Sequence, residues 1–202
     1  MAYSEFIRLN QLKTDFGIDH EMMAFRWELE NVSPSQHLID DLSEASSMPL
    51  LTEKAKSEFL ISPVLKELRR NCLIEIFSGY EFDVDEKRKL TGFCDYLLAP
   101  DTQSIEIKSP VFCIVEAKNR SIEEGFAEVG SEMIAARLFN EKNGVITPTV
   151  YGCVTNAYEW NFLKLENEIL FIENRRYFLQ GDDNLRTLLQ ILCNIAQNFT
   201  QS

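Results

Sequence analysis

The stretch Gly92–Arg120, GFCDYLLAPDTQSIEIKSPVFCIVEAKNR, decides how this chain is expected to fold. It reads as a strand that carries Asp95, a polar connection, and a very apolar strand, Val111 to Ala117, with Glu-Ala-Lys at positions 116 to 118. Residues two apart on a strand project from the same face. Glu116 and Lys118 are therefore expected to project together at the end of a buried strand.

A hairpin between these two strands would bring the carboxylate of Asp95 close to that of Glu116. Two neighbouring carboxylates repel each other unless a proton or a cation lies between them. Mg²⁺ prefers oxygen ligands and usually takes one or two carboxylates from a protein, so the pattern predicts a divalent metal site. A lysine beside such a site, here Lys118, can orient or deprotonate water, or stabilise the charge on a phosphate under attack.

An ion pair is the alternative explanation for the charges at this strand end. An acidic residue and a lysine two apart are common where strands end in solvent. Here the residues that precede Glu116, Pro110 to Val115, are apolar, so the charges lie at the end of a strand that should be buried. Unpaired charge is costly there, and an ion pair of Glu116 with Lys118 or Arg120 would also satisfy this constraint.

Two segments of the chain resemble a known family. Residues 92–96, GFCDY, and residues 114–119, IVEAKN, are similar to the motifs of the PD-(D/E)XK nuclease superfamily, which has the restriction endonuclease-like fold. More narrowly, the chain resembles a group of uncharacterised bacterial proteins, familiar from cyanobacteria, over about residues 52–165. Cys94 stands where the superfamily is named for a proline, a departure that is frequent among its members.

The resemblance implies a function and the residues that perform it. Asp95 and Glu116 would bind Mg²⁺ or Mn²⁺, and Lys118 would assist the attacking water. The reaction implied is metal-dependent hydrolysis of phosphodiester bonds in nucleic acid, DNA in preference to RNA, of restriction or repair type.

The resemblance also indicates supporting residues. The helix before the sheet often presents an acidic residue to the metal, and we prefer Glu58 to Glu53 because Glu58 directly precedes two apolar residues of the buried stripe. A solvent-facing helix position explains Glu58 equally well. Asn119 and Glu128 are expected to contact the metal ligands and hold them in position without binding the metal themselves. The superfamily usually carries a glutamine where Glu128 stands, so the site either tolerates a further ligand or has changed its chemistry.

The size of the chain is that of one domain with an extension. Its 202 residues, 45% hydrophobic and 26% charged, are enough for a substantial core. We assign residues 1–49 to an N-terminal extension that packs on the domain or meets a partner, and residues 50–202 to the nuclease-like domain. No apolar run suggests a signal peptide or a membrane span, so we expect a cytoplasmic protein without a membrane partner.

Cysteine and histidine usage argues against other kinds of site. The five cysteines are widely spaced, form no Cys-x-x-Cys pair and resemble buried hydrophobes in a reducing compartment. The two histidines, His20 and His37, lie near none of them in the sequence. A zinc site, a Cys–His nucleophile and a Ser-His-Asp hydrolase therefore gain little support.

The net charge of −12 opposes a role with nucleic acid. Much of the affinity for DNA comes from lysine and arginine that neutralise phosphates, and an acidic protein loses that long-range attraction. Local basic groups do occur, and a metal ion offsets the acidity of its own site. These groups are Lys66, Arg69-Arg70, Lys87-Arg88-Lys89 and Arg175-Arg176.

Hydrophobic periodicity predicts alternating helices and strands. Pro63 should bend or break the second helix, and the strand at 149–155 should pair parallel with its neighbour after a long helix. The segment 6–16 fits either a short helix or an edge strand with a turn. The predicted helices are 36–45, 52–71, 122–140 and 185–199, and the predicted strands around the quoted stretch are 73–77, 80–84, 149–155, 161–165 and 169–172.

The predicted fold class is therefore α/β, a restriction endonuclease-like core whose mixed central sheet is flanked by helices. The small residues of the 122–140 helix should allow it to approach the sheet closely. The final helix is expected to pack on the domain or to form a homodimer contact. Two functional hypotheses follow: a metal-dependent nuclease, and a catalytically inactive module of the same fold that serves protein interaction or assembly.

Overall fold

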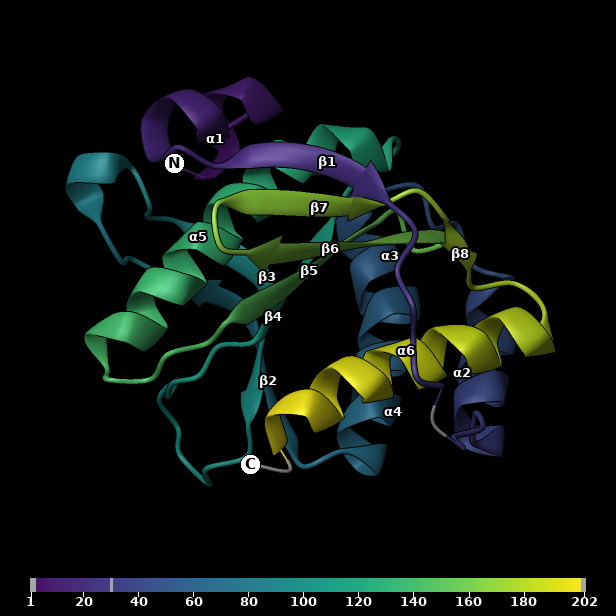
Figure 1. Cartoon of the computed structure of the whole chain (residues 1–202). Helices are drawn as coiled ribbons and strands as arrows, with labels where there is room; N and C mark the ends of the chain where they lie inside the picture. Colours follow the sequence, from purple (N-terminus) through teal and green to yellow (C-terminus); the bar gives the residue numbers. More distant parts are fainter. Residues whose placement is uncertain (1–2, 30, 201–202) are drawn as a thin grey trace.

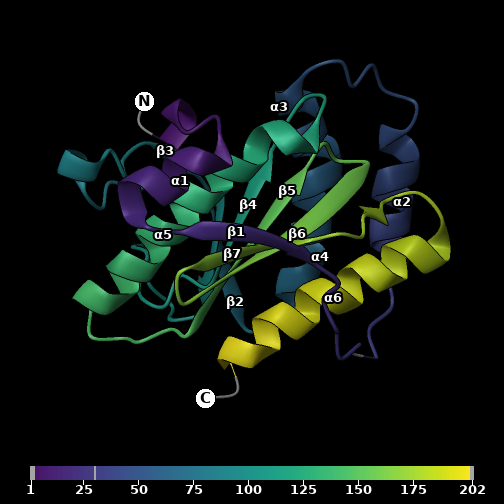
Figure 2. The same cartoon turned by 45° about the horizontal axis from the view of Figure 1, so that its top comes forward.

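The computed structural model describes residues 3–29 and 31–200 and has an α/β architecture. A mixed sheet of eight strands lies at its centre, with helices on both faces (Figures 1 and 2). The strand order is β1-β7-β6-β5-β4-β3-β2, and β8 pairs with β6 off this path. The predicted class, a mixed sheet flanked by helices, is confirmed.

The strands meet in both orientations. β4 pairs parallel with β5, as the long intervening helix predicted, and β1 pairs parallel with β7. The other pairs are antiparallel. The strands are β1 (Asp19–Met23), β2 (Ile74–Glu81), β3 (Phe93–Pro100), β4 (Cys113–Ala117), β5 (Thr149–Thr155), β6 (Glu159–Glu166), β7 (Ile169–Glu173) and β8 (Tyr177–Phe178).

The helices form two layers. α1 and α5 cover one face of the sheet, and α2, α4 and α6 cover the other (Figures 1 and 2). No helix in the described part of the chain is long and apolar enough to cross a membrane. The helices are α1 (Leu9–Phe16), α2 (Gln36–Ala45), α3 (Glu53–Lys56), α4 (Ser62–Asn71), α5 (Phe126–Lys142) and α6 (Asp182–Thr200), with short turns η1 (Tyr3–Glu5), η2 (Ser57–Ile61), η3 (Glu86–Arg88) and η4 (Ile122–Gly125).

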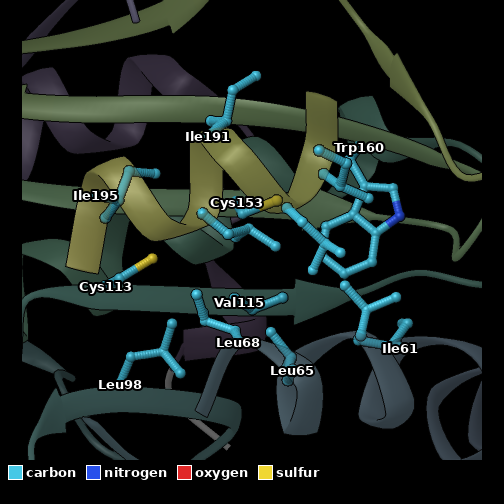
Figure 3. Packing of buried hydrophobic residues seen from close by; sticks show 14 of the residues in the cluster. Ile61, Leu65, Leu68, Leu98, Cys113, Val115, Cys153, Trp160, Ile191 and Ile195 are labelled. Carbon is cyan, nitrogen blue, oxygen red and sulfur yellow. The ribbon is translucent and has the colours of Figure 1, made fainter. Parts of the chain in front are cut away.

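Strand β4 is buried on both faces because each helical layer packs against it. Figure 3 shows side chains of α4, such as Leu65, and of α6, such as Ile195, meeting over Cys113 and Val115 of β4. Ile114 projects to the opposite core beneath α5. A strand enclosed in this way reads as a continuous apolar run, which the sequence displays here. All five cysteines are buried, as expected of small hydrophobic residues.

The N-terminal residues belong to the same sheet and cores. The segment 6–16, which fitted either a helix or an edge strand, forms helix α1, which packs on α5. The strand at the edge of the sheet, β1, follows it in the chain. Tyr3, Leu12 and Ile18 are fully enclosed in the core beneath α5. The segment assigned to an extension is thus integral to the packed structure.

The helical segment around Pro63 continues from α3 through η2 into α4. Thr52 caps its start by accepting a hydrogen bond from the Ala55 N–H (3.1 Å). The chain then passes through a single wide turn, η2, in which the Ser62 N–H bonds to Ser57 O five residues earlier. Pro63 follows directly, at the first turn of α4, where the missing N–H costs little. Of the two predicted effects, a bend or a break, the break does not occur, since the wide turn accommodates the proline.

Strand β2 differs from a second prediction, that of two separate strands at 73–77 and 80–84. The residues Ser78-Gly79 were expected to form a turn between two strands, but β2 runs through them without interruption. Gly79 has φ 58°, in the left-handed region that other residues rarely adopt. The rings of Phe77 and Tyr80, three residues apart, consequently lie on the same face with centroids 5.4 Å apart. The glycine kinks the strand and does not reverse it.

Strand β3 is irregular at the matching position. Cys94 and Tyr96 are two residues apart, yet they pack into the cores on opposite faces of the sheet. Their partners on β2 are Tyr80 and Ser78, so Gly79 lies directly across from Asp95. Both strands therefore change direction where Asp95 projects, and this kink orients the carboxylate.

Substitution of Gly79 tests the kink. No atom lies within 4 Å of a β-carbon built at this position, so a side chain would meet only the backbone penalty. Gly79→Ala is expected to lower the free energy of unfolding by about 1–2 kcal/mol, and Gly79→Asn by less, because asparagine tolerates left-handed backbone. Urea denaturation at constant m-value measures both changes. An alanine variant as stable as the wild type would show that the strand needs no positive φ.

Candidate active site

The site begins where the β3–β4 ladder ends. Tyr96 faces Val115 in the antiparallel register, so the next residues in each strand, Asp95 and Glu116, come together. The Ala117 N–H donates a hydrogen bond to Asp95 Oδ2 (2.8 Å). At the end of the ladder, a side-chain carboxylate thus accepts the hydrogen bond of a backbone N–H. The predicted hairpin is present, and it brings the two carboxylates close enough for each to act on the pKa of the other.

Lys118 lies between two carboxylates from different elements. Its Nζ is 2.7 Å from Glu116 Oε1 and 2.5 Å from Glu128 Oε2, at the first turn of α5. Glu128 therefore faces the site, on the sheet side of its helix. Arg120, the other basic residue considered for Glu116, is exposed. The ion pair considered from the sequence exists, and Glu128 extends it.

A glycine allows α5 to come this close to the lysine. A β-carbon at Gly125 would lie 2.6 Å from Val154 Cγ1 and 3.2 Å from Lys118 Cε. The first distance is shorter than two carbons tolerate. Any larger residue would push the start of the helix away from the sheet, and Glu128 with it. The close approach predicted from the small residues of this helix is present at Gly125.

Burial and mutual repulsion perturb the carboxyl groups. Glu116 is only 5% exposed, and burial, together with the neighbouring charge of Asp95, raises its pKa to about 8 even though Lys118 opposes the shift. Burial also raises the pKa of Asp95, against the opposing Ala117 N–H and Lys118. Burial alone would lower the pKa of Lys118, but Glu116 and Glu128 outweigh it and raise that pKa.

Glu132 is a carboxylate of this site that the sequence analysis missed. It lies one turn beyond Glu128 on α5, is 0% exposed, and neither of its oxygens meets a hydrogen-bond partner in the described structure. Burial, followed by repulsion from Glu116 and Glu128, raises its pKa well above the usual range. The four-residue spacing from Glu128 was the available signal, because it places both acids on one helix face.

The two acidic candidates of the first helix face different groups. Burial raises the pKa of Glu53, and repulsion from Asp95 adds to this effect. Both glutamates nevertheless keep contact with solvent, and the charge of Glu58 acts on the phenol of Tyr96. Both line one cleft of about 380 Å³, formed by Glu53, Lys54, Ser57, Glu58, Ser62, Ser78, Asp95, Tyr96 and Ala117. Glu53 is the one that belongs electrostatically to the carboxylate cluster.

Asn119 connects the first helix to the end of β4. Lys56 Nζ donates to Asn119 O (2.6 Å) and to Asn119 Oδ1 (3.2 Å). The backbone N–H of Asn119 also lowers the pKa of Glu53, against the effect of burial. Asn119 thus connects the helix to the turn that follows Lys118, and its expected role in supporting the ligands stays a prediction.

Negative charge exceeds positive charge in this cluster. Asp95, Glu116, Glu128 and Glu132 supply four carboxylates to the single ammonium of Lys118, a formal charge of −3 if all are ionised. Within residues 3–29 and 31–200, no three His, Cys, Asp or Glu side chains are already arranged to hold a metal ion.

Comparison of the chain with models of known families, with curated proteins and with solved structures found no match. The arguments for its function therefore rest on the residues and their geometry.

The raised pKa of Glu116 predicts how stability depends on pH. The unfolded chain releases this proton near the ordinary value of 4.5, whereas the folded protein keeps it until about 8. The folded state binds more protons within this window, so the free energy of unfolding should fall as the pH rises from about 4.5 to about 8. Glu116→Gln should flatten the dependence, as followed by urea denaturation across this range. Glu21→Gln, on the exposed edge strand, is the matched control and should keep the wild-type slope; an unchanged slope in Glu116→Gln would contradict the assignment.

Proposed function

We propose that this chain is a metal-dependent nuclease of the PD-(D/E)XK type, which hydrolyses phosphodiester bonds in nucleic acid, DNA in preference to RNA, in restriction or repair. The observation that supports this proposal is the convergence of Asp95, Glu116 and Lys118 at the end of the β3–β4 hairpin. A buried excess of carboxylate beside a lysine is the arrangement that such hydrolysis uses.

The side chains present fit Mg²⁺ or Mn²⁺. The available donors are carboxylate oxygens, which hard divalent ions prefer, and the cluster has more negative charge than Lys118 balances. Asp95 and Glu116 would hold the ion, and Glu53 is better placed than Glu58 to add a third carboxylate. A bound divalent cation supplies Lewis acidity, which lowers the pKa of water and offsets phosphate charge.

Lys118 acts as a fixed positive charge in this proposal. Its two carboxylate partners raise its pKa, so it stays protonated at neutral pH and serves poorly as a base while it is paired. Its ammonium group can donate to a phosphate oxygen and stabilise the negative charge that develops during attack. Glu128 holds the ammonium in place from the α5 side when Glu116 is engaged as a ligand.

The second candidate, a catalytically inactive module of the same fold, rests on the same ion pairs. Lys118 is already neutralised by Glu116 and Glu128, and the net charge of −12 disfavours contact with a polyanion. A module that serves protein interaction or assembly needs neither a metal nor a free lysine.

Substitution of the lysine tests the catalytic proposal. Lys118→Ala should reduce Mg²⁺- or Mn²⁺-dependent cleavage by about 10²–10⁴-fold, because it removes a positioned charge from the transition state. Stabilisation of the fold by the metal should remain, since the lysine is not a ligand. Cleavage of labelled DNA and RNA, each single-stranded and duplex, measures the first effect, and thermal unfolding measures the second.

The control is Lys87→Ala, in the exposed turn η3, which should cleave like the wild type. Wild-type protein without activity on any of these substrates would favour the inactive module. Full activity in purified Lys118→Ala would assign the lysine a different role.

Metal binding gives a test that does not depend on catalysis. Mn²⁺ at 100 times its Kd should stabilise the folded protein by about 2.7 kcal/mol, because the ion binds the native state alone. Asp95→Asn should abolish the rise in Tm, and Glu53→Gln should reduce it more than Glu58→Gln. If Glu58→Gln abolishes the rise in Tm and Glu53→Gln leaves it intact, Glu58 is the ligand and Glu53 is not.

A further inference from the structure

The cleft beside the carboxylates is small. Its lining comes from the helical segment around Ser57 and from strands β2, β3 and β4, with Asp95 among the strand residues. Its volume of about 380 Å³ lies at the lower end of the range for small-molecule sites, which extends from ~300 to ~1,000 Å³. Recognition of a duplex instead uses a broad surface, typically ~1,000–2,500 Å² of protein. The cleft therefore suits a single nucleotide unit.

The charged groups of the cleft give no excess of positive charge. Of the residues that line it, Lys54 is cationic, whereas Glu53, Glu58 and Asp95 are acidic, a formal sum of −2 if all are ionised. One divalent cation would bring this sum to zero. The lining would then hold a single phosphodiester locally, but it would not attract the many phosphates of a long duplex.

The rest of the lining is rich in hydroxyl groups. The Ser57 and Tyr96 hydroxyl oxygens are 2.6 Å apart, and Ser78 lines the same cleft. Ser62 extends this row along the helix. Hydroxyl groups contact phosphate and sugar oxygens without adding charge. They therefore position the nucleic-acid backbone but give no long-range electrostatic attraction.

The net charge of the whole chain also disfavours the binding of a long duplex. It carries 32 acidic residues against 20 basic ones. A protein that binds duplex DNA through 6–10 phosphates depends on the release of the same number of counterions, which requires a basic surface. A strand end with few phosphates meets far less repulsion from an acidic surface.

We infer that the substrate of the proposed site is a short single-stranded segment or strand end, bound through one or two phosphates, and not a duplex. This inference rests on the proposed nuclease function and adds the substrate class. Lys54, at the cleft wall, is the cation that binds a phosphate beside the scissile one.

The experiment compares two DNA substrates with Mn²⁺ and wild-type protein. One is a labelled single-stranded hexamer, and the other is a 24-base-pair duplex that contains the same six bases. The hexamer should be cleaved with at least tenfold higher kcat/KM. Its kcat/KM should fall by less than about tenfold between 50 and 200 mM KCl, as expected for about two phosphate contacts.

Faster cleavage of the duplex, with a loss of ~10³-fold or more over the same salt range, would overturn the inference and leave the nuclease proposal standing. Cleavage of neither substrate with either metal would overturn both.

A charge-matched pair of variants tests the role of Lys54. Lys54→Glu should raise KM for the hexamer about tenfold with little change in kcat, because it removes a phosphate contact. Lys87→Glu makes the same charge change outside the cleft and should leave KM near the wild-type value. Equal increases in both variants would show that the overall field, and not the cleft, governs binding, and would overturn the assignment.

Discussion

The hydrogen bond from the Ala117 N–H to the carboxylate of Asp95 is the contact on which the site depends. It forms where the β3–β4 ladder ends, and it places an acidic group beside Glu116 at a position enclosed by packed side chains. Asp95 can reach this donor because both β2 and β3 are kinked there, β2 at Gly79. A local irregularity of the backbone thus supports the chemistry of the site, as irregular strand positions often do.

Enclosure of β4 between two helical layers imposes the second constraint. Helices α4 and α6 cover one face and α5 the other, so a charge at the end of this strand cannot be hydrated freely. One ammonium group lies in the cluster, and the carboxyl pKa values are raised, so some carboxyl groups keep their protons. The negative charge that remains must be neutralised by further protons or by a cation. Burying these acids costs free energy and contributes no stability of its own. The extensive apolar burial around the cluster offsets that cost.

The helix that starts near Thr52 links this cluster to its surroundings. Its wide turn η2 accommodates Pro63 and lets the helix continue along the cleft. Lys56 donates to Asn119, so the helix and the turn after β4 are connected. The same helix therefore supplies the wall of the cleft, a carboxylate beside Asp95 and the support for the residue that follows Lys118.

The sequence by itself determined the features that depend on local periodicity. The apolar run before Glu116, the two-residue spacing to Lys118 and the long helix before β5 predicted the hairpin, the shared face and the parallel β4–β5 pairing, because these follow from strand and helix geometry. Only the tertiary structure decided what depends on contacts between distant segments. The continuity of β2 through Gly79, the role of β1 as an edge strand and the repulsion between Glu53 and Asp95 required the packed fold. Glu132 shows the physical reason most clearly: a glutamate in a helix reads as solvent-facing, and only the neighbours that bury it, contributed by other parts of the chain, turn it into a buried acid of the site.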